Sequence, residues 1–243
     1  MKIALISDIH GNLNALEAVL ADIKKEKADQ IICLGDVATI GPQPVEVIRR
    51  LKKLRNCQFI MGNHDAALLN PEQAEFYEIA SALKPMLNWC AGLMKKNELE
   101  FLRAFQPVIE IPLNEQDSML CFHGSPDSNT RNIYSTTPGN EMEELFGLLR
   151  ETVMVGGHTH IQMLRKHHGK LIINAGSVGS AFRKTPKPNE TPVLLPWAEY
   201  AVVEIKDNNL NVSLKRIEFD TRDYKNVIEN SSNPLKGWLS SQY

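Results

Sequence analysis

Apolar residues of two different periods alternate along this chain. Short apolar runs of the kind found in buried strands occupy residues 2–7, 30–34 and 58–61. Between the first two runs, apolar side chains recur at helical spacing, at Leu13, Leu16, Val19, Leu20 and Ile23. Residues 45–54 predict a second helix. Strands that alternate with helices are typical of a layered α/β fold.

The rest of the chain continues this alternation. Residues 71–105 are predicted to be mostly helical, with Pro85 as a break or kink. Further strands are predicted at residues 108–112, 119–122, 153–155 and 171–174. Residues 199–205 and 210–217 flank the turn-forming residues 207–209, which predicts a β-hairpin. The last part of the chain has weak helical character.

Polar, proline-containing stretches interrupt the pattern at two places. Residues 125–140 and residues 183–196 are predicted as loops. Each is either a lid on the substrate side or a solvated connector, since long ordered loops are often functional. His167 and His168 are predicted as solvated residues of a hairpin turn.

Composition and charge narrow the classes of function. The chain has 243 residues, a mass of 27.3 kDa and 43% hydrophobic residues, so we expect one domain over residues 1–243. A net charge of -2 leaves no broad basic surface, so no long nucleic acid is expected as a partner. The 4 cysteines form no Cys-x-x-Cys pair, and Cys33 and Cys121 lie inside apolar runs. We expect reduced thiols.

Two features bear on the cellular location. The first residues form a short apolar run that ends in charge, which predicts a strand and not a secretion signal. No segment approaches the roughly 18 consecutive apolar residues of a membrane helix. We therefore expect a soluble, cytoplasmic protein with no membrane partner.

Acidic, amide and imidazole side chains follow directly after several predicted strands. Because ligands gather beyond the carboxyl ends of strands in open α/β sheets, these side chains are expected to converge in one crevice. They form the blocks Asp8-Ile9-His10, Gly35-Asp36, Gly62-Asn63-His64-Asp65, His123-Gly124 and Gly157-His158-Thr159-His160. Their donors are all nitrogen or oxygen, a set that suits Mn²⁺, Fe or Zn²⁺. The pattern predicts a two-metal hydrolytic site, in which Asp36 bridges the ions with its two oxygens.

These blocks, in this order, resemble the motif series of the calcineurin-like metallophosphoesterases over roughly residues 1–180. The resemblance implies a four-layer αββα sandwich, with two mixed β-sheets and helices outside. The alternation of elements by itself is equally compatible with a doubly wound sheet. The resemblance also implies the ligands of each metal. The first metal is expected on Asp8, His10, Asp36 and His160, and the second on Asp36, Asn63, His123 and His158.

The resemblance also implies a mechanism. Two divalent cations, Mn²⁺ first and Fe or Zn²⁺ as alternatives, clamp a phosphoryl group and lower the pKa of a bridging water towards about 7. The resulting hydroxide attacks phosphorus in line with the leaving oxygen. His64 has no metal in the family's scheme and is expected to protonate the leaving group or stabilise the phosphoryl oxygens. Asp65 is expected either to orient His64 or to cap the helix that follows.

Departures from the relatives narrow the substrate. The family's protein phosphatases carry an Asp-Arg pair shortly after Gly-Asp, whereas residues 37–44 here contain no arginine. The size and motif spacing resemble those of the small bacterial and archaeal phosphodiesterases. Residues 174–179 also resemble the Asn-Pro-Gly-Ser turn of those proteins, so Gly176 is expected to serve a backbone turn and Ser177 is not expected to be catalytic.

A small phosphorylated substrate is therefore expected, either a diester of a small molecule or a nucleotide, with some monoesterase activity. The alternatives are a dinucleoside polyphosphate hydrolase and a protein phosphatase. In another class, the alternative is a non-catalytic interaction scaffold on the same fold.

Overall fold

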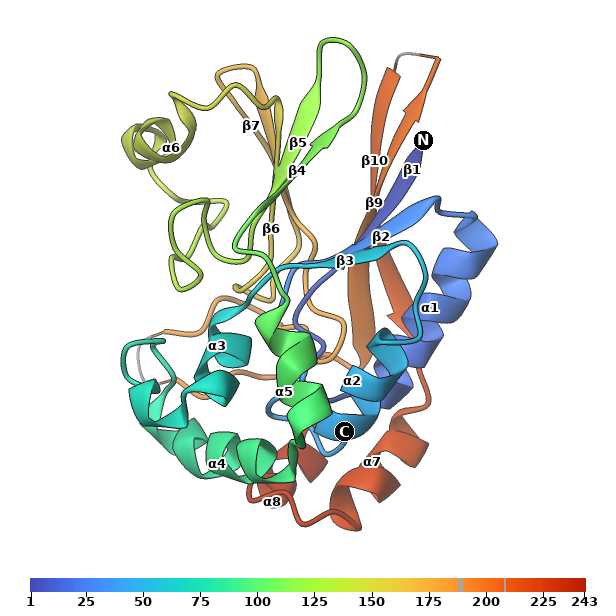
Figure 1. Cartoon of the computed structure of the whole chain (residues 1–243), viewed down its shortest axis with the longest axis vertical. Helices are drawn as coiled ribbons and strands as arrows, with labels where there is room; N and C mark the ends of the chain where they lie inside the picture. The colour runs from blue at the N-terminus through green and yellow to red at the C-terminus, as the bar shows by residue number, and fades with distance from the viewer. Residues whose placement is uncertain (188–189, 208) are drawn as a thin grey trace.

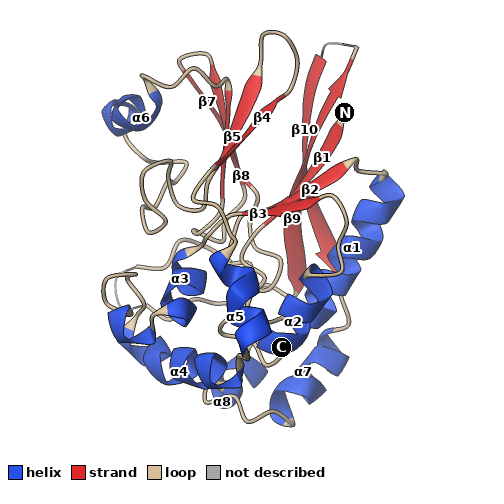
Figure 2. Ribbon diagram, viewed as in Figure 1, coloured by secondary structure: helices blue, strands red, loops and turns tan. Residues whose placement is uncertain are grey.

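Two five-stranded sheets form the centre of the molecule (Figures 1 and 2). The computed structural model describes residues 1–187, 190–207 and 209–243, so Pro188 of the predicted 183–196 loop and Asn208 of the predicted turn lie outside the described residues. The first sheet has the order β10-β9-β1-β2-β3. Its strands are β1 (Lys2–Ile6), β2 (Gln30–Cys33), β3 (Cys57–Phe59), β9 (Trp197–Lys206) and β10 (Asn209–Glu218).

The second sheet has the order β4-β5-β6-β8-β7. Its strands are β4 (Ile109–Pro112), β5 (Ser118–Cys121), β6 (Val153–Gly156), β7 (Met163–His167) and β8 (Lys170–Asn174). In the first sheet β1, β2, β3 and β10 run in one direction and β9 runs in the other. In the second sheet β5, β6 and β8 run in one direction, and β4 and β7 run in the other. The implied pair of mixed sheets is confirmed.

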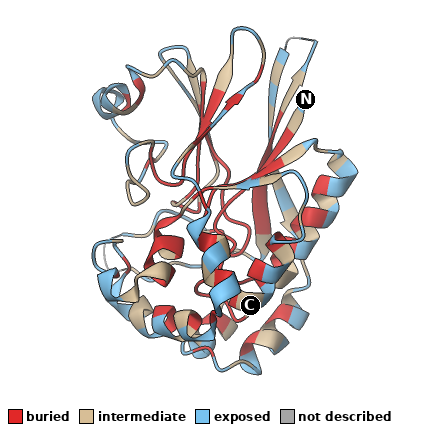
Figure 3. Ribbon diagram, in the orientation of Figure 1, coloured by how far each residue is buried: buried red, intermediate tan, exposed pale blue. Residues whose placement is uncertain are grey.

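Strand β1 shows how one apolar run serves two cores. Ile3 and Leu5 face the space between the sheets, while Ala4 and Ile6 face the helices outside, and all of them are fully buried. Because both faces of the strand are covered, its sequence is continuously apolar and not alternating. Consecutive residues of β5 and β6 are buried in the same way, and Figure 3 shows the buried residues of both sheets in red.

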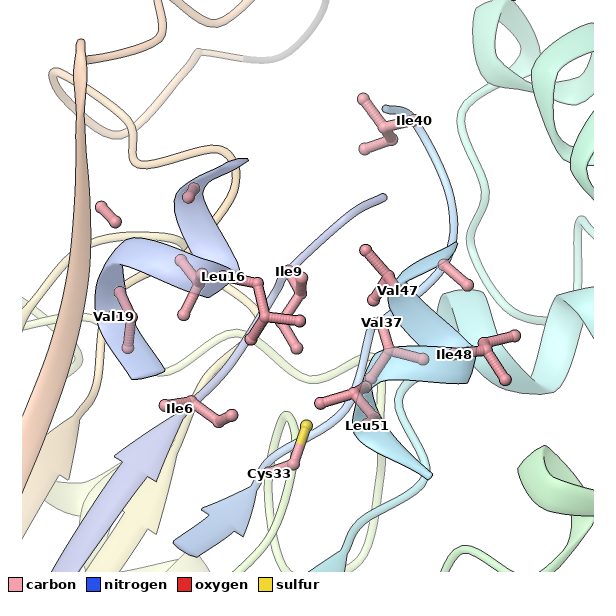
Figure 4. Packing of buried hydrophobic residues seen from close by; sticks show 14 of the residues in the cluster. Ile6, Ile9, Leu16, Val19, Cys33, Val37, Ile40, Val47, Ile48 and Leu51 are labelled. Atoms are coloured by element: carbon pink, nitrogen blue, oxygen red, sulfur yellow. The ribbon is translucent and has the colours of Figure 1, made fainter. Parts of the chain in front are cut away.

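Helices cover the outer face of each sheet and complete the four layers. On the first sheet, α1 (Leu13–Glu26) and α2 (Pro44–Leu51) pack apolar side chains against β1 and β2 (Figure 4). On the second, α6 (Gly139–Phe146) packs Met142 and Phe146 against Phe122. The remaining helices are α3 (Asn63–Leu69), α4 (Lys84–Leu93), α5 (Lys96–Arg103), α7 (Thr221–Glu229) and α8 (Lys236–Ser240), with short 3₁₀ turns at Pro71–Gln73 and Ser81–Leu83.

Several predicted elements need correction. Pro85 does not kink a helix but lies in the first turn of α4, where its missing N–H has no helical partner to lose. Phe76, predicted on an apolar helical face, is 77% exposed in the segment before α4. The predicted 125–140 loop ends where α6 begins at Gly139. Strand β7 was not predicted, because its half-buried, charge-rich sequence lacks a clear period.

The expectation for the cysteines agrees with the structure. All 4 cysteines are free, and Cys33, Cys90 and Cys121 are buried. Burial raises the pKa of the Cys90 thiol to about 12, so this group stays protonated at neutral pH. None of the helices in the described part of the chain combines the length and hydropathy that crossing a bilayer requires.

Candidate metal centre

The carboxyl ends of the parallel strands in both sheets meet at one place. Asp8 follows β1, Asp36 follows β2 and Asn63 follows β3, while His123 follows β5 and the 158–160 segment follows β6. The expected convergence of these residues is observed, since Asp8 Oδ1 lies 3.2 Å from His160 Nε2 although the two residues lie far apart in the sequence. Asp8, His10, Asp36, Asn63, His123 and His160 are all buried.

A first group of donors consists of Asp8, His10 and His160. His160 Nε2 lies 3.0 Å from His10 Nε2 and 3.2 Å from Asp8 Oδ1. His160 Nδ1 donates to the Ser180 carbonyl at 2.7 Å, which leaves Nε2 with its lone pair when the ring is neutral. His10 Nδ1 lies 2.9 Å from the Thr39 hydroxyl. Outer hydrogen bonds of this kind select the tautomer of metal-binding histidines.

The charges of this first group are incompletely balanced by protein atoms. Asp8 Oδ2 accepts from the backbone N–H of His158 at 3.0 Å, but Oδ1 is buried without a hydrogen-bond partner among the described residues. Burial and the neighbouring His160 lower the pKa of His10 well below its usual value, so this ring is neutral. A buried carboxylate oxygen without a partner is costly, and a cation at this position would satisfy it and both imidazole lone pairs. The residues therefore fit a metal ion.

A second group of donors consists of Asp36, His123 and His158, with Asn63 beside it. His123 Nδ1 donates to the Leu34 carbonyl at 2.6 Å, and its Nε2 lies 3.2 Å from Asn63 Oδ1. Asn63 Nδ2 donates to the Tyr77 carbonyl at 2.9 Å, so the amide oxygen is the atom directed at His123. His123 and Asn63 are thus each oriented by a backbone carbonyl, and each leaves one nitrogen or oxygen for a cation.

Asp36 lies between the two groups. Its Oδ2 is 3.4 Å from His123 Nε2 and 3.9 Å from His10 Nε2. Its Oδ1 accepts from the backbone N–H of His64, at the start of α3, at 2.9 Å. One of the two oxygens expected to bridge the ions therefore also accepts a hydrogen bond from the first turn of α3. Burial raises the pKa of Asp36, but His123 and His64 outweigh it and hold that pKa well below the usual value.

His64 and Asp65 have different surroundings. Asp65 accepts from the backbone N–H groups of Gly62, Asp36 and Val37, and it makes no hydrogen bond to His64 in the described structure. Of its two predicted roles, the structure supports capping of α3 and not orientation of His64. The His64 ring lies edge-on to His10 with centroids 5.2 Å apart, and its Nδ1 has no partner among the described residues.

The donor residues hold an unusual backbone conformation. Positive φ angles occur at Asp8 (53°), His10 (46°), Asp36 (57°), His158 (65°) and His160 (58°). Left-handed conformations of non-glycine residues cost of order 1–3 kcal/mol each and persist only where surrounding structure enforces them. Their concentration at one site is typical of a functional centre.

Sequence reasoning missed the residues that orient the donors. Thr39 and the backbone carbonyls of Tyr77 and Thr130 belong to no sequence motif. The same is true of Phe182, whose ring centroid lies 4.3 Å from that of His160. The 174–179 turn was predicted correctly: Gly176 has a φ of 78°. Ser177 Oγ donates to the carbonyl of Asp8 at 2.7 Å, which is a structural role.

Comparisons with known proteins agree with this geometry. The calcineurin-like phosphoesterase superfamily domain matches residues 1–206. The chain is 28% identical over 246 residues to an uncharacterized protein from Methanocaldococcus jannaschii, covering 99% of this chain and 96% of that protein. It is 38% identical over 224 residues to a symmetrical bis(5'-nucleosyl)-tetraphosphatase from Psychromonas ingrahamii, covering 82% and 77%. A metallophosphoesterase crystal structure from Sphaerobacter thermophilus superposes with a TM-score of 0.75 at 25% identity, covering 100% and 98%.

The close approach of α3 to Asp36 predicts opposite effects of two glycine substitutions. A Cβ at residue 62 would overlap the carboxylate and the backbone nitrogen of Asp36, so Gly62→Ala is expected to destabilise the fold by about 1–3 kcal/mol. Gly92 in α4 has open space around its Cα, so Gly92→Ala is expected to stabilise by about 0.5–1 kcal/mol. Urea unfolding of both variants measures the difference, and equal stability of Gly62→Ala and the unmodified protein would contradict the first expectation.

Proposed function

Since the chain belongs to the calcineurin-like phosphoesterase superfamily, we propose that it is a binuclear metal-dependent phosphoesterase of small phosphate esters or nucleotides. Family membership makes it a hydrolase of phosphoric esters. The observation that carries the binuclear proposal is the pair of buried donor groups that meet at Asp36 Oδ2, with Asp8 Oδ1 left without a hydrogen-bond partner among the described residues. We also propose that residues 1–243 form one domain, because β9 and β10 complete the first sheet.

The proposed ligands follow the two groups. Asp8, His10 and His160 would hold the first ion and Asn63, His123 and His158 the second, with Asp36 shared. Nitrogen and oxygen donors suit Mn²⁺, our first choice, and also Fe and Zn²⁺. When bound, such a metal pair polarises the phosphoryl group and lowers the pKa of a coordinated water to about 7.

The chain's own residues complete the proposed chemistry. The backbone N–H of His64 donates a hydrogen bond to Asp36. The His64 ring lies beside His10, and its Nδ1 has no hydrogen-bond partner among the described residues. We assign it the task of donating a proton or hydrogen bond to the leaving or phosphoryl oxygen. Asp65 acts at one remove, because it holds the backbone of the Asp36 turn against α3.

The segment after Asp36 bears on the substrate. Where the family's protein phosphatases carry an Asp-Arg pair, Val37 and Ala38 are fully buried here. Asn233 Nδ2 donates to the carbonyls of Ile40 and Gly41 at 2.7 and 3.1 Å, so this stretch is packed as part of the core. It therefore offers no cation to grip a phosphate, which favours small esters over phosphoproteins.

A dinucleoside polyphosphate is the second candidate substrate. It is favoured by the 38% identity to a protein named as a symmetrical bis(5'-nucleosyl)-tetraphosphatase. A hydrolase of that kind cuts an anhydride, whereas a phosphodiesterase cuts an ester. Turnover of bis-p-nitrophenyl phosphate and of diadenosine tetraphosphate, each with added Mn²⁺, separates the two. Absence of metal binding and of turnover on both compounds would favour the non-catalytic scaffold instead.

Replacement of the shared carboxylate is expected to abolish activity. Asp36→Asn keeps the shape of the side chain but removes its charge, so the second equivalent of metal is lost. Turnover should fall by more than about 100-fold, since loss of even an outer partner of a metal ligand costs about 10–100-fold. Metal analysis and diesterase assays measure both effects, with Asp207→Asn at an exposed position as the control. An active Asp36→Asn enzyme with two metals would refute the assignment.

Thr39 is expected to control metal affinity without touching the metal. Thr39→Val has the same shape but cannot accept from His10 Nδ1, so His10 loses the partner that presents Nε2 to the first group. We expect metal affinity to fall by about 10–100-fold, and Thr39→Ser to retain most of it. Competition with a chelator measures this affinity without any activity assay. Equal affinities of the Val and Ser variants would exclude the role of the hydroxyl.

His64→Ala is expected to separate metal binding from catalysis. The variant should keep its metals, because His64 contributes only its backbone N–H to Asp36. Turnover of alkyl phosphodiesters should fall by about 10²–10⁴-fold, because an alkoxide requires protonation as it leaves. Turnover of p-nitrophenyl esters should fall much less. The same loss for both leaving groups would argue against proton donation.

A further inference from the structure

The hairpin of β7 and β8 forms hydrogen bonds at several places with the segment that contains α6. Arg165 Nη1, on β7, donates to the carbonyls of residues 134, 135 and 137 at 3.4, 3.2 and 2.7 Å. Lys170 Nζ, on β8, donates to the carbonyls of Leu149 and Glu151 at 2.6 and 2.9 Å. Between these two contacts, the turn of the hairpin meets Glu143 of α6.

Glu143, His167 and His168 form a compact cluster of donors at this turn. Glu143 Oε2 lies 3.5 Å from His167 Nε2 and 3.1 Å from His168 Nδ1. The two imidazole rings are stacked, with centroids 4.2 Å apart and planes 8° from parallel. The cluster lies at the turn between β7 and β8, which is at the opposite end of the second sheet from the donors around Asp36 (Figure 1).

The sequence-based expectation that both histidines are solvated is wrong for one of them. The side chain of His168 is 73% exposed, but that of His167 is only 10% exposed. His167 Nε2 is buried and has no hydrogen-bond partner among the described residues. A buried nitrogen of this kind is costly unless something satisfies it, and it is directed towards Glu143.

We propose that Glu143, His167 and His168 bind a Zn²⁺ ion, separate from the proposed binuclear centre. Two ligands at about 2.1 Å in tetrahedral coordination are about 3.4 Å apart, close to the separations of Glu143 Oε2 from the two imidazole nitrogens. Two nitrogens and one carboxylate oxygen are a donor set that Zn²⁺ accepts, with water in the remaining position.

Parallel rings cannot both direct an in-plane lone pair at one ion, so binding requires one ring to turn. His168 is the ring with freedom to do so, because it is largely exposed and lies in the hairpin turn with a φ of 45°. His167 stays in place, since its ring packs close to Gly139 at the start of α6. When the ion binds, the two imidazole rings therefore cease to be stacked, and both coordinate the ion instead.

The consequence of this site is mechanical. Helix α6 follows directly on the segment that contains Thr130, and the carbonyl of Thr130 accepts from His158 Nε2 at 2.9 Å. An ion that ties α6 to the β7–β8 turn restrains the far end of this segment, which Arg165 already holds near its middle. The ion has a structural role and takes no part in phosphoester cleavage.

Zinc stoichiometry tests the proposal. The metal-free protein is equilibrated with micromolar Zn²⁺, and bound zinc is measured after dialysis. We expect Glu143→Gln and His167→Ala each to bind one equivalent fewer than the unmodified protein. Glu144→Gln, the exposed neighbour outside the cluster, is the matched control and should bind the full number. Zn²⁺ should also raise the melting temperature of Glu144→Gln more than that of Glu143→Gln.

Equal zinc content and equal thermal shifts in Glu143→Gln and Glu144→Gln would overturn the proposal and leave a simple contact between Glu143 and the histidines. Phosphodiesterase activity with saturating Mn²⁺ is measured on the same samples and should be unchanged in Glu143→Gln. The two proposals fail separately: inactive protein that loses one zinc with Glu143→Gln contradicts only the proposed function, while active protein with equal zinc in both variants contradicts only this site.

Discussion

Two carboxylates and three buried imidazoles share one small space where the two sheets meet, and the need to balance their charges constrains the structure around them. Asp36 approaches donors of both groups within 3.9 Å, so the loops after β1, β2, β5 and β6 cannot move independently. Buried carboxylates are expensive without a balancing positive charge. The centre is thus an arrangement whose electrostatic balance metal ions would complete.

The surrounding backbone supplies the rigidity that such a centre requires. Most of the donor residues adopt left-handed φ angles, and the outer nitrogens of the histidines and of Asn63 are tied to Thr39 or to backbone carbonyls. Each tie selects one tautomer or one amide orientation. Asp65 links the start of α3 to the Asp36 turn through three backbone N–H groups, so its carboxyl group helps to fix where the Asp36 carboxylate lies.

The two ends of the second sheet perform different tasks in this scheme. At the carboxyl ends of β5 and β6 the sheet presents His123 and His158 to the candidate centre. At the opposite end, the β7–β8 hairpin holds α6 and the segment before it through Arg165, Lys170 and the cluster at Glu143. The same segment brings the Thr130 carbonyl to His158, and Arg165 holds this segment near its middle.

Local chemistry in the sequence was sufficient for every strand of the sheets except β7, for the first two helices and for naming the candidate donor residues that the fold brings together. Strand and helix periods arise from burial of neighbouring side chains, and metal donors must be Asp, Asn or His whatever the fold. The packing of two sheets against each other was predicted only from the family resemblance. Apolar strands buried on both faces have the same sequence pattern in a four-layer sandwich and in a doubly wound sheet.

Other features were decided only by tertiary contacts. Helix α6, the hydrogen bond on one oxygen of Asp36, the capping role of Asp65 and the burial of His167 all depend on partners far away in sequence. A sequence lists the donors and acceptors that a chain possesses. Which of them meet, and which are left for a metal or a substrate, follows from close packing between segments that no local pattern relates.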